Sequence, residues 1–242
     1  MPMRSMLAEA GYIKRKTMNI RLSLGIASAA AALVAVSGCG GSPTLGTASN
    51  PRIRVVDALQ TPATVNVTVD GGLITGVNTF QNVSNYQVFN NGNRTVIFTD
   101  ASTGATLINQ SSPYTLNSFY TAIGYQSASG PALMVLQDSD HLGSTQGSIR
   151  FVKAAAGSSA SVDFYVIPAG NSLATQTPIY TAVTLGNVSQ AYRSFTSGTY
   201  TVTETIAGTK TPIISQQITL SGGAATTLLD VGTSTFLTLQ DQ

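Results

Sequence analysis

Two short stretches of the chain alternate strictly between two kinds of residue. In residues 65–70 (VNVTVD) every second residue is a valine, and the residues between are polar. In residues 199–206 (TYTVTETI) every second residue is a threonine, and the set between them is largely apolar. A period of two is typical of a β-strand that places one side on a core and the other in water. Both stretches are therefore predicted strands.

The remainder of the chain after residue 39 favours the same kind of element. Its apolar runs are short, and Gly, Asn, Pro and Ser interrupt them, as expected for strands joined by turns. Threonine and valine are frequent, and their branched side chains pack well on a pleated surface. No amphipathic helix is evident. The predicted fold class is all-β.

The chain also repeats itself. IRVVDALQ begins at Ile53 and IRFVKAAA at Ile149, NVSNYQVF has its counterpart in NVSQAYRSF, and LQD closes both copies. About seven strand segments per copy, with turn residues every 8–12 positions, predict two tandem immunoglobulin-like β-sandwiches. We place repeat 1 at 51–140 and repeat 2 at 146–242. One closed barrel built from both copies is the alternative, and the separate LQD endings argue against it.

A leader precedes the repeats. Residues 22–36 carry no charge, and Val36-Ser37-Gly38-Cys39 follows the pattern of an aliphatic residue, two small residues and a cysteine. This resembles the bacterial lipoprotein signal, which implies cleavage before Cys39, diacylglycerol on its sulfur and an acyl group on the new amino terminus. Two or three acyl chains hold a protein durably on a membrane. An ordinary signal peptide and an uncleaved anchor remain the alternatives.

These assignments give residues 1–38 as the signal peptide and 39–50 as a lipidated cysteine with a flexible tether. Translation starts at Met1 or, because the basic region is then of more usual length, at Met18. Gly40 in place of aspartate favours the outer membrane. The predicted location is the bacterial cell envelope, with the membrane as a partner through Cys39.

Charge changes the picture once the leader is set aside. Five of the 12 basic residues lie in residues 1–38, but only one of the 10 acidic ones, so the mature chain is slightly acidic. No basic patch or tail remains, which argues against nucleic-acid binding. The only cysteine is predicted to be acylated and is therefore not expected to act as a thiol nucleophile.

The repeat motifs carry a family resemblance. The succession IRVVDA, VNVTVDGG and NVSNYQVF, with its second copy IRFVKA, VDFYV and SGTYTVT, resembles the bacterial domain-of-unknown-function family numbered 4397. The resemblance implies tandem domains in secreted or lipid-anchored envelope proteins. The family has no established catalytic residue that could be assigned to a position of this chain. The first copy departs from it with GNRTV at 92–96, and the second has IPAG in place of the Asp-Gly turn.

Candidate chemistry is sparse. Asp138, Asp140 and the single histidine, His141, lie close together between the repeats and could hold a divalent metal, with a solvated linker as the alternative. A Ser-His-Asp arrangement would have to use His141, and no G-x-S-x-G motif is present. We therefore expect neither an enzyme nor a cofactor.

Glu204 is the only glutamate of the mature chain and lies on the apolar side of its predicted strand. An unpaired buried carboxylate is costly, so the residue should be neutral, paired or exposed. One hypothesis is a glycosidase-type acid, which needs a second carboxylate across a cleft. The alternative, which we favour, is a strand end or bulge that turns Glu204 outward.

Aromatic residues in SPYTLNSFYTAIGYQ offer a possible binding surface. If exposed, Tyr114 and Tyr120 could stack on sugar rings or meet a protein partner. Phe119 and Tyr125 share parity with Ile123, which indicates a core position for part of the set. Tyr86 and Tyr192 occupy equivalent positions in the two copies, which indicates a repeated packing role.

Three functional hypotheses follow. The first is a non-catalytic, lipid-anchored envelope protein that presents two sandwiches for structural or adhesive interactions, with an envelope protein as partner. The second is a carbohydrate-binding module with an envelope glycan as partner, and the third is a hydrolase. Exposed tyrosines would favour the second, and a deep cleft with two carboxylates the third.

Overall fold

A computed structural model describes residues 48–138, 143–157, 159–187 and 191–242 of the chain. These residues all belong to one compact unit, Gly46–Gln242. The predictions for Met18, the signal peptide and Cys39 concern residues outside this description, as do those for Asp140 and His141. Within the described residues, no helix has the length and apolar character needed to cross a membrane.

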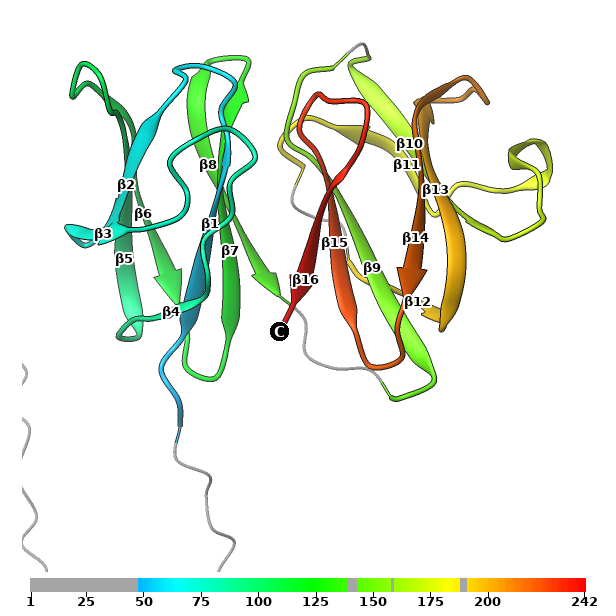
Figure 1. The fold of residues 1–242 in the computed structure, drawn as a ribbon, viewed down its shortest axis with the longest axis horizontal. Coiled ribbons are helices and arrows are strands. Elements are labelled where there is room, and N and C mark those ends of the chain that lie inside the picture. Colours follow the sequence, from blue (N-terminus) through cyan, green and yellow to red (C-terminus); the bar gives the residue numbers. More distant parts are fainter. Residues whose placement is uncertain (1–47, 139–142, 158, 188–190) are drawn as a thin grey trace, which may run out of the picture. The chain divides into compact units, whose positions relative to one another are not determined.

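The first sandwich consists of two four-stranded sheets, ordered β4-β1-β7-β8 and β3-β2-β5-β6 (Figure 1, blue to green). Its strands are β1 (Arg52–Ala58), β2 (Val65–Val69), β3 (Gly72–Ile74), β4 (Gln87–Val88), β5 (Gly92–Asp100), β6 (Thr106–Tyr114), β7 (Phe119–Ser127) and β8 (Gly130–Asp138).

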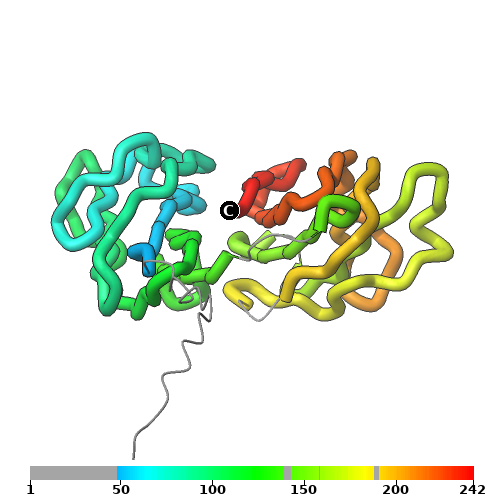
Figure 2. Tube along the Cα trace, turned by 90° about the horizontal axis from the view of Figure 1, so that it is seen from below, coloured from blue at the N-terminus to red at the C-terminus, as the bar shows by residue number. Residues whose placement is uncertain are grey.

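The second sandwich repeats this topology with sheets β12-β9-β15-β16 and β11-β10-β13-β14 (Figure 1, yellow-green to red). Its strands are β9 (Gln146–Lys153), β10 (Ser161–Pro168), β11 (Tyr180–Thr184), β12 (Arg193–Thr196), β13 (Gly198–Ile206), β14 (Pro212–Leu220), β15 (Ala225–Asp230) and β16 (Leu237–Asp241). A 3-10 helix, η1 (Leu173–Thr175), lies between β10 and β11. Figure 2 shows the two sandwiches from a second direction.

Both sandwiches close in the same way. β1 pairs in parallel with β7, and β9 pairs in parallel with β15, whereas the other named ladders are antiparallel. The first strand of each copy therefore lies beside the seventh, and residues far apart in sequence become neighbours. This pairing brings Lys153 opposite Asp230 in the second copy.

Each sandwich has its own apolar core. In the first, the valines of β2 alternate inward and pack with Val96 and Phe98 of β5. In the second, Phe151 and Phe164 stack with their ring centroids 4.2 Å apart, and Phe236 meets both rings edge-on. The apolar residues that alternate along these strands are thus buried on one face of each sheet, as the sequence indicated.

The predicted all-β class and the sandwich architecture are confirmed. The closed-barrel alternative is wrong, because the strands form four separate sheets. Each sandwich has eight strands where about seven were predicted from turn spacing. The difference lies in very short elements such as β4, whose two residues are too few to show a period.

Candidate functional site

The two sandwiches meet through the outer faces of sheets β4-β1-β7-β8 and β12-β9-β15-β16, a contact that we call the junction. Along β1, Ile53 and Val55 point into the sandwich core, so Arg54, Val56 and Ala58 point the other way. All five are buried, because the second sandwich covers the outer face. One apolar cluster draws residues from both copies: Val56, Ala58, Ile123, Met134, Leu136, Val152, Ala154, Leu229, Val231 and Leu239.

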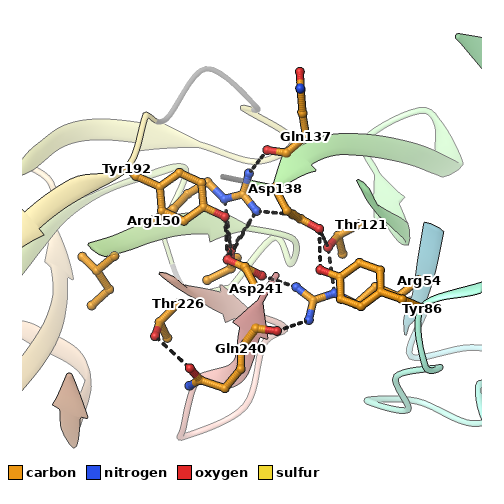
Figure 3. Close-up of polar contacts among 12 residues, drawn as sticks. Arg54, Tyr86, Thr121, Gln137, Asp138, Arg150, Tyr192, Thr226, Gln240 and Asp241 are labelled. Atoms are coloured by element: carbon orange, nitrogen blue, oxygen red, sulfur yellow. Dashed lines mark hydrogen bonds and ion pairs between the residues drawn. The ribbon is translucent and has the colours of Figure 1, made fainter. Parts of the chain in front are cut away.

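Arg54 reaches across the junction from β1. Its Nη2 donates to the Asp241 carboxylate of β16 in an ion pair, and its Nη1 donates to the Gln240 carbonyl at 2.7 Å. Nε donates to Thr121 Oγ1 of its own sandwich at 2.8 Å, and the guanidinium lies 4.8 Å from the Tyr86 ring centroid. Figure 3 shows this side chain pointing toward Asp241.

Arg150 makes the same contacts in the opposite direction. From β9, its Nη2 donates to Asp138 Oδ1 of β8 at 2.8 Å, and its Nη1 donates to the Gln137 carbonyl at 2.9 Å. Nε donates to Thr227 Oγ1 at 3.0 Å, and the guanidinium lies 4.5 Å from the Tyr192 ring centroid. Equivalent residues exchange partners, which is the pattern of a two-fold interface within one chain.

The second oxygen of each carboxylate accepts hydrogen bonds from its own sandwich. Tyr86 and Thr121 donate to Asp138 Oδ2 at 2.7 and 2.8 Å. Tyr192 and Thr227 donate to Asp241 Oδ2 at 2.5 and 2.6 Å. We call these eight side chains the junction cluster: Arg54, Tyr86, Thr121, Asp138, Arg150, Tyr192, Thr227 and Asp241.

Burial sets the electrostatics of the junction cluster. Loss of water raises the pKa of Asp241, and the neighbouring charge of Asp138 raises it further. Burial also raises the pKa of Tyr86 and of Tyr192 well above its usual value. Both phenols therefore stay protonated and act as hydrogen-bond donors. The cluster is suited to holding two sheets together, since its charges are paired and saturated.

A second charged group lies inside the second sandwich. Lys153 of β9 places Nζ 2.7 Å from Asp230 Oδ2 of β15 and 3.5 Å from Glu204 Oε1 of β13. The three side chains, here called the buried triad, are at most 3% exposed. Lys153 follows the inward parity of Ile149 and Phe151, so the register of β9 directs its ammonium into the sandwich.

Glu204 is the least satisfied member of the buried triad. Among the described residues, its Oε2 has no hydrogen-bond partner. Its pKa is raised to about 7, mainly by burial and then by the negative charge of Asp230, while Lys153 acts to lower it. Asp230 is better held, because its Oδ1 accepts the Gly232 N–H at 2.8 Å. Glu204 is thus set to exchange a proton near neutral pH.

The first sandwich fills the equivalent space differently. Asp57, Phe98 and Gly124 occupy the positions of Lys153, Glu204 and Asp230 in the matching strand registers. A Cβ at Gly124 would lie 2.7 Å from the Phe98 ring, so the ring uses the space that a side chain would need. Asp57 is fully buried, and burial raises its pKa to about 6.

Tyr114 and Tyr120, the candidates for a binding surface if exposed, are not exposed. Tyr114 and Tyr120 are 1% and 6% exposed and pack edge-to-face in the first core, with ring centroids 4.8 Å apart. Their parity turns them inward, so their rings are closed to a sugar or a protein partner. Burial raises the pKa of Tyr114 to about 12.

Other aromatic predictions are partly right. Tyr86 and Tyr192 do have a repeated packing role, at the junction. Phe119 and Tyr125 share the parity of Ile123, but that parity faces the junction and not the sandwich core. Tyr125 packs against the apolar junction cluster, and Phe119 meets Tyr86 edge-on.

The predictions around Asp138 and Glu204 also change. Asp138 is not part of a solvated linker, because it ends β8, is 5% exposed and pairs with Arg150. No three His, Cys, Asp or Glu side chains in the described parts of the chain gather as a metal site. Glu204 does not turn outward: the register shift beside it places the extra residue on β14, and Glu204 stays inside.

Sequence reasoning missed Lys153 and Asp230. The signal was present in IRFVK, where the lysine shares parity with two large apolar residues, and in TTLLD, where the aspartate shares parity with Leu228. Two charged residues on the apolar side of two strands, together with Glu204, indicate mutual pairing inside a core. Only the parallel pairing of β9 with β15 shows that they meet.

A pocket of about 270 Å³ borders the buried triad. Ala58, Gln60 and Gln126 of the first sandwich and Ala154, Gly157 and Gly232 of the second contribute to its lining. Gly157 separates it from the lysine, since a Cβ at that residue would lie 3.0 Å from Lys153 Nζ. The pocket is small and nearly uncharged, and it offers no cleft with two carboxylates.

Comparison with solved structures gives two remote likenesses. One is the CBMbc module of family CBM26 from Eubacterium rectale Amy13K in complex with maltoheptaose, with 10% identity, 74% of this chain and 90% of that chain covered, and a TM-score of 0.25. The other is a leucine-rich repeat protein from Bacteroides thetaiotaomicron, with 13% identity, 74% and 25% covered, and a TM-score of 0.20. At these scores neither carries an argument about this chain.

Sequence families give a clearer relation. No curated protein matches the chain. The family model described as "Domain of unknown function (DUF4397)" matches residues 51–165, a stretch that begins just before β1 and ends within β10. The match supports the resemblance seen in the sequence motifs over the whole first sandwich. Residues 51–165 of this chain are therefore similar to the DUF4397 family.

Proposed function

We propose that this chain is a non-catalytic, lipid-anchored protein of the bacterial cell envelope that presents two joined β-sandwiches for structural or adhesive interactions. The observation that carries the proposal is the junction. It joins the two copies through a shared apolar cluster and two reciprocal buried ion pairs. A protein that must hold two modules together while exposed outside the cell benefits from such a contact.

The anchor rests on the sequence. Val36-Ser37-Gly38-Cys39 follows an uncharged apolar run, and a Gly-, Ser- and Thr-rich tether separates it from β1. Acyl chains on Cys39 would hold the sandwiches at a membrane surface, and the tether would let them reach outward. Gly40 favours the outer membrane.

The non-catalytic assignment rests on how the charged side chains are used. Both junction arginines and both junction carboxylates bind one another and leave no acceptor atom for a substrate. The buried triad lies inside the second sandwich and does not line a cleft. These contacts support a structural role over a hydrolase.

The carbohydrate-binding alternative has lost the residues that motivated it, because Tyr114 and Tyr120 lie in the core. A glycan array probed with the full chain tests it directly. Specific binding to an envelope glycan would replace the adhesive interpretation with this one.

Metabolic labelling with a fatty-acid analogue tests the anchor. The wild-type chain should take up label and fractionate with membranes, and Cys39→Ala should lose both. Ser42→Ala, in the tether but outside the Val-Ser-Gly-Cys motif, is the matched control and should label normally. Equal labelling of wild type and Cys39→Ala would contradict the proposal, as would an unlabelled wild-type chain.

A further inference from the structure

We propose that Lys153 and Asp230 condense to an intramolecular amide bond, with Glu204 carrying the proton. The two residues are register partners on the parallel strands β9 and β15, and Lys153 Nζ lies 2.7 Å from Asp230 Oδ2. The third group, Glu204 of the opposite sheet, places Oε1 3.5 Å from the same nitrogen. This inference is independent of the anchor and of any adhesive role.

The chemistry needs an amine without its extra proton, and Glu204 is placed to take that proton. An ammonium cannot attack a carbon, because its nitrogen lone pair is occupied. Glu204 Oε1 is within reach of Nζ, and burial raises the pKa of the Glu204 carboxyl to about 7, so this carboxylate is a better base than an exposed one. Transfer of the proton replaces two buried charges with two neutral groups, which a water-free interior favours.

The step balances without a further reagent. Nζ attacks Cγ of Asp230, and a C–N bond forms. Oδ2 then leaves with two of the three ammonium protons as one water molecule, one of these protons having travelled through Glu204. The third proton stays on the new amide nitrogen. Nothing is oxidised or reduced, and the net charge of the ion pair, zero, is unchanged.

The surroundings assist this step. Asp230 Oδ1 accepts the Gly232 N–H at 2.8 Å, and this donor would stabilise negative charge on that oxygen in the tetrahedral intermediate. Fixed reactants of this kind reach effective molarities of about 10⁵–10⁸ M. Gly157 and Gly232 both line the neighbouring pocket, which gives the released water a place to go.

The product also explains an otherwise costly core. Three charged side chains at most 3% exposed, with one carboxylate oxygen unpartnered among the described residues, form an expensive group. Condensation removes the ammonium and one carboxylate together. The first sandwich cannot make this bond, because Asp57, Phe98 and Gly124 stand at the three positions and none supplies an amine.

Peptide mapping of the purified full chain tests the proposal. Trypsin acting on an unlinked chain should release residues 151–153, 154–193 and 211–242 as separate peptides. With the bond in place, cleavage after Lys153 is blocked. Residues 151–193 should then appear joined to residues 211–242, lighter than their sum by one water molecule. Lipid on Cys39 does not interfere, since it changes a different peptide.

Tandem fragmentation decides the outcome. Fragments that locate the link between Lys153 and Asp230 support the proposal. Unlinked peptides at their full mass overturn it. Loss of water confined to the 211–242 peptide also overturns it, because that result marks cyclisation of an aspartate on its own backbone.

Glu204→Gln keeps the shape of the third side chain and removes its basicity. We expect bond formation to slow by about 10²–10⁴-fold, the usual contribution of a general acid–base group. The 151–153 peptide should therefore reappear in freshly purified variant. Asp57→Asn, the same carboxyl-to-amide type of change at a buried residue of the first sandwich, should leave the link complete. A fully linked Glu204→Gln protein would overturn the role of Glu204. Circular dichroism on each variant shows that it is folded, and the wild-type map decides the bond whether or not they are.

Discussion

The two sandwiches share a topology and an outward-facing cluster but differ at one place inside. Arg54, Thr121 and Asp138 have counterparts in Arg150, Thr227 and Asp241. In both copies the arginine Nε donates to the threonine hydroxyl, and the threonine donates to the aspartate. The inward positions on the same strands hold Asp57 and Gly124 in one copy but Lys153 and Asp230 in the other.

The difference shows which positions are constrained by their neighbours. A junction residue contacts the other copy, so a change in one copy has to suit both. The core residues of each sandwich pack only against residues of the same sandwich. One core can therefore fill its space with the Phe98 ring over a glycine, while the other builds a charged group in the same register.

The largest expected effect comes from breaking the shared cluster. Arg150→Ala leaves Asp138 buried without its cation, and Arg54→Ala leaves Asp241 with only the more distant Nη2 of Arg150, at 3.8 Å. Each change should lower the free energy of unfolding by about 3–5 kcal/mol. Urea unfolding of the two variants provides the measurement. The comparison requires similar losses, so a loss below about 1 kcal/mol in either one, as for an exposed pair, would contradict it.

The pH dependence of stability should separate the two cores. Burial raises the pKa of Asp57 to about 6 from 3.8, so the folded state holds the proton longer than the unfolded state does. The contribution of Asp57 to the free energy of unfolding is therefore complete at low pH and is lost as pH rises from about 4 to about 6. At 1.36 kcal/mol per pKa unit, the loss is about 3 kcal/mol.

Urea titrations between these pH values test this expectation. Asp57→Asn should flatten the curve in that window, because it cannot ionise. Burial is the largest cause of the raised pKa of Glu204, and it persists after Lys153 and Asp230 condense, so Glu204 should extend the loss of stability above pH 6. A wild-type protein that gains stability from pH 4 to 6 would contradict the assignment for Asp57.

A smaller effect should follow from crowding the first core. Gly124→Ala places a methyl group 2.7 Å from the Phe98 ring, and overpacking of this kind costs about 1–3 kcal/mol. Gly143→Ala is the control, because open space surrounds its Cβ position. Chemical denaturation of both variants checks the prediction, and equal stability would show that Phe98 moves aside freely.

The smallest effect belongs to the exposed pair of Arg94 with Asp70. Nη1 lies 2.7 Å from Oδ2, as close as a buried pair, but the two side chains are 24% and 37% exposed. Arg94→Ala should cost at most about 1 kcal/mol, and the loss should shrink as salt is added. A cost near that of Arg150→Ala would mean that burial does not set the strength of these pairs.

Much of the fold could be predicted from alternation alone. The parity of residues 65–70 placed their valines correctly in a core, and the repeated motifs predicted two similar sandwiches. For Tyr120 on β7, alternation alone does not say which face is open, because its sheet packs on both faces. A sheet covered on both faces removes the distinction between an inward and an exposed set.

The positions of the charged residues could not be predicted from the sequence, and the reason is a different one. Glu204 was expected to turn outward because an isolated buried carboxylate is costly. Its cation is supplied by β9, some 50 residues away in sequence, and the second carboxylate by β15. Pairing across this distance depends on topology, which periodicity along one strand does not report.

The reciprocal form of the junction has one more consequence. A face that recognises its own equivalent is self-complementary, and two copies satisfy it completely. Because the two copies are joined in one polypeptide, each copy covers the matching face of the other. The part of the chain that the structure describes therefore has no leftover half-site of this kind through which further molecules could add in a growing filament.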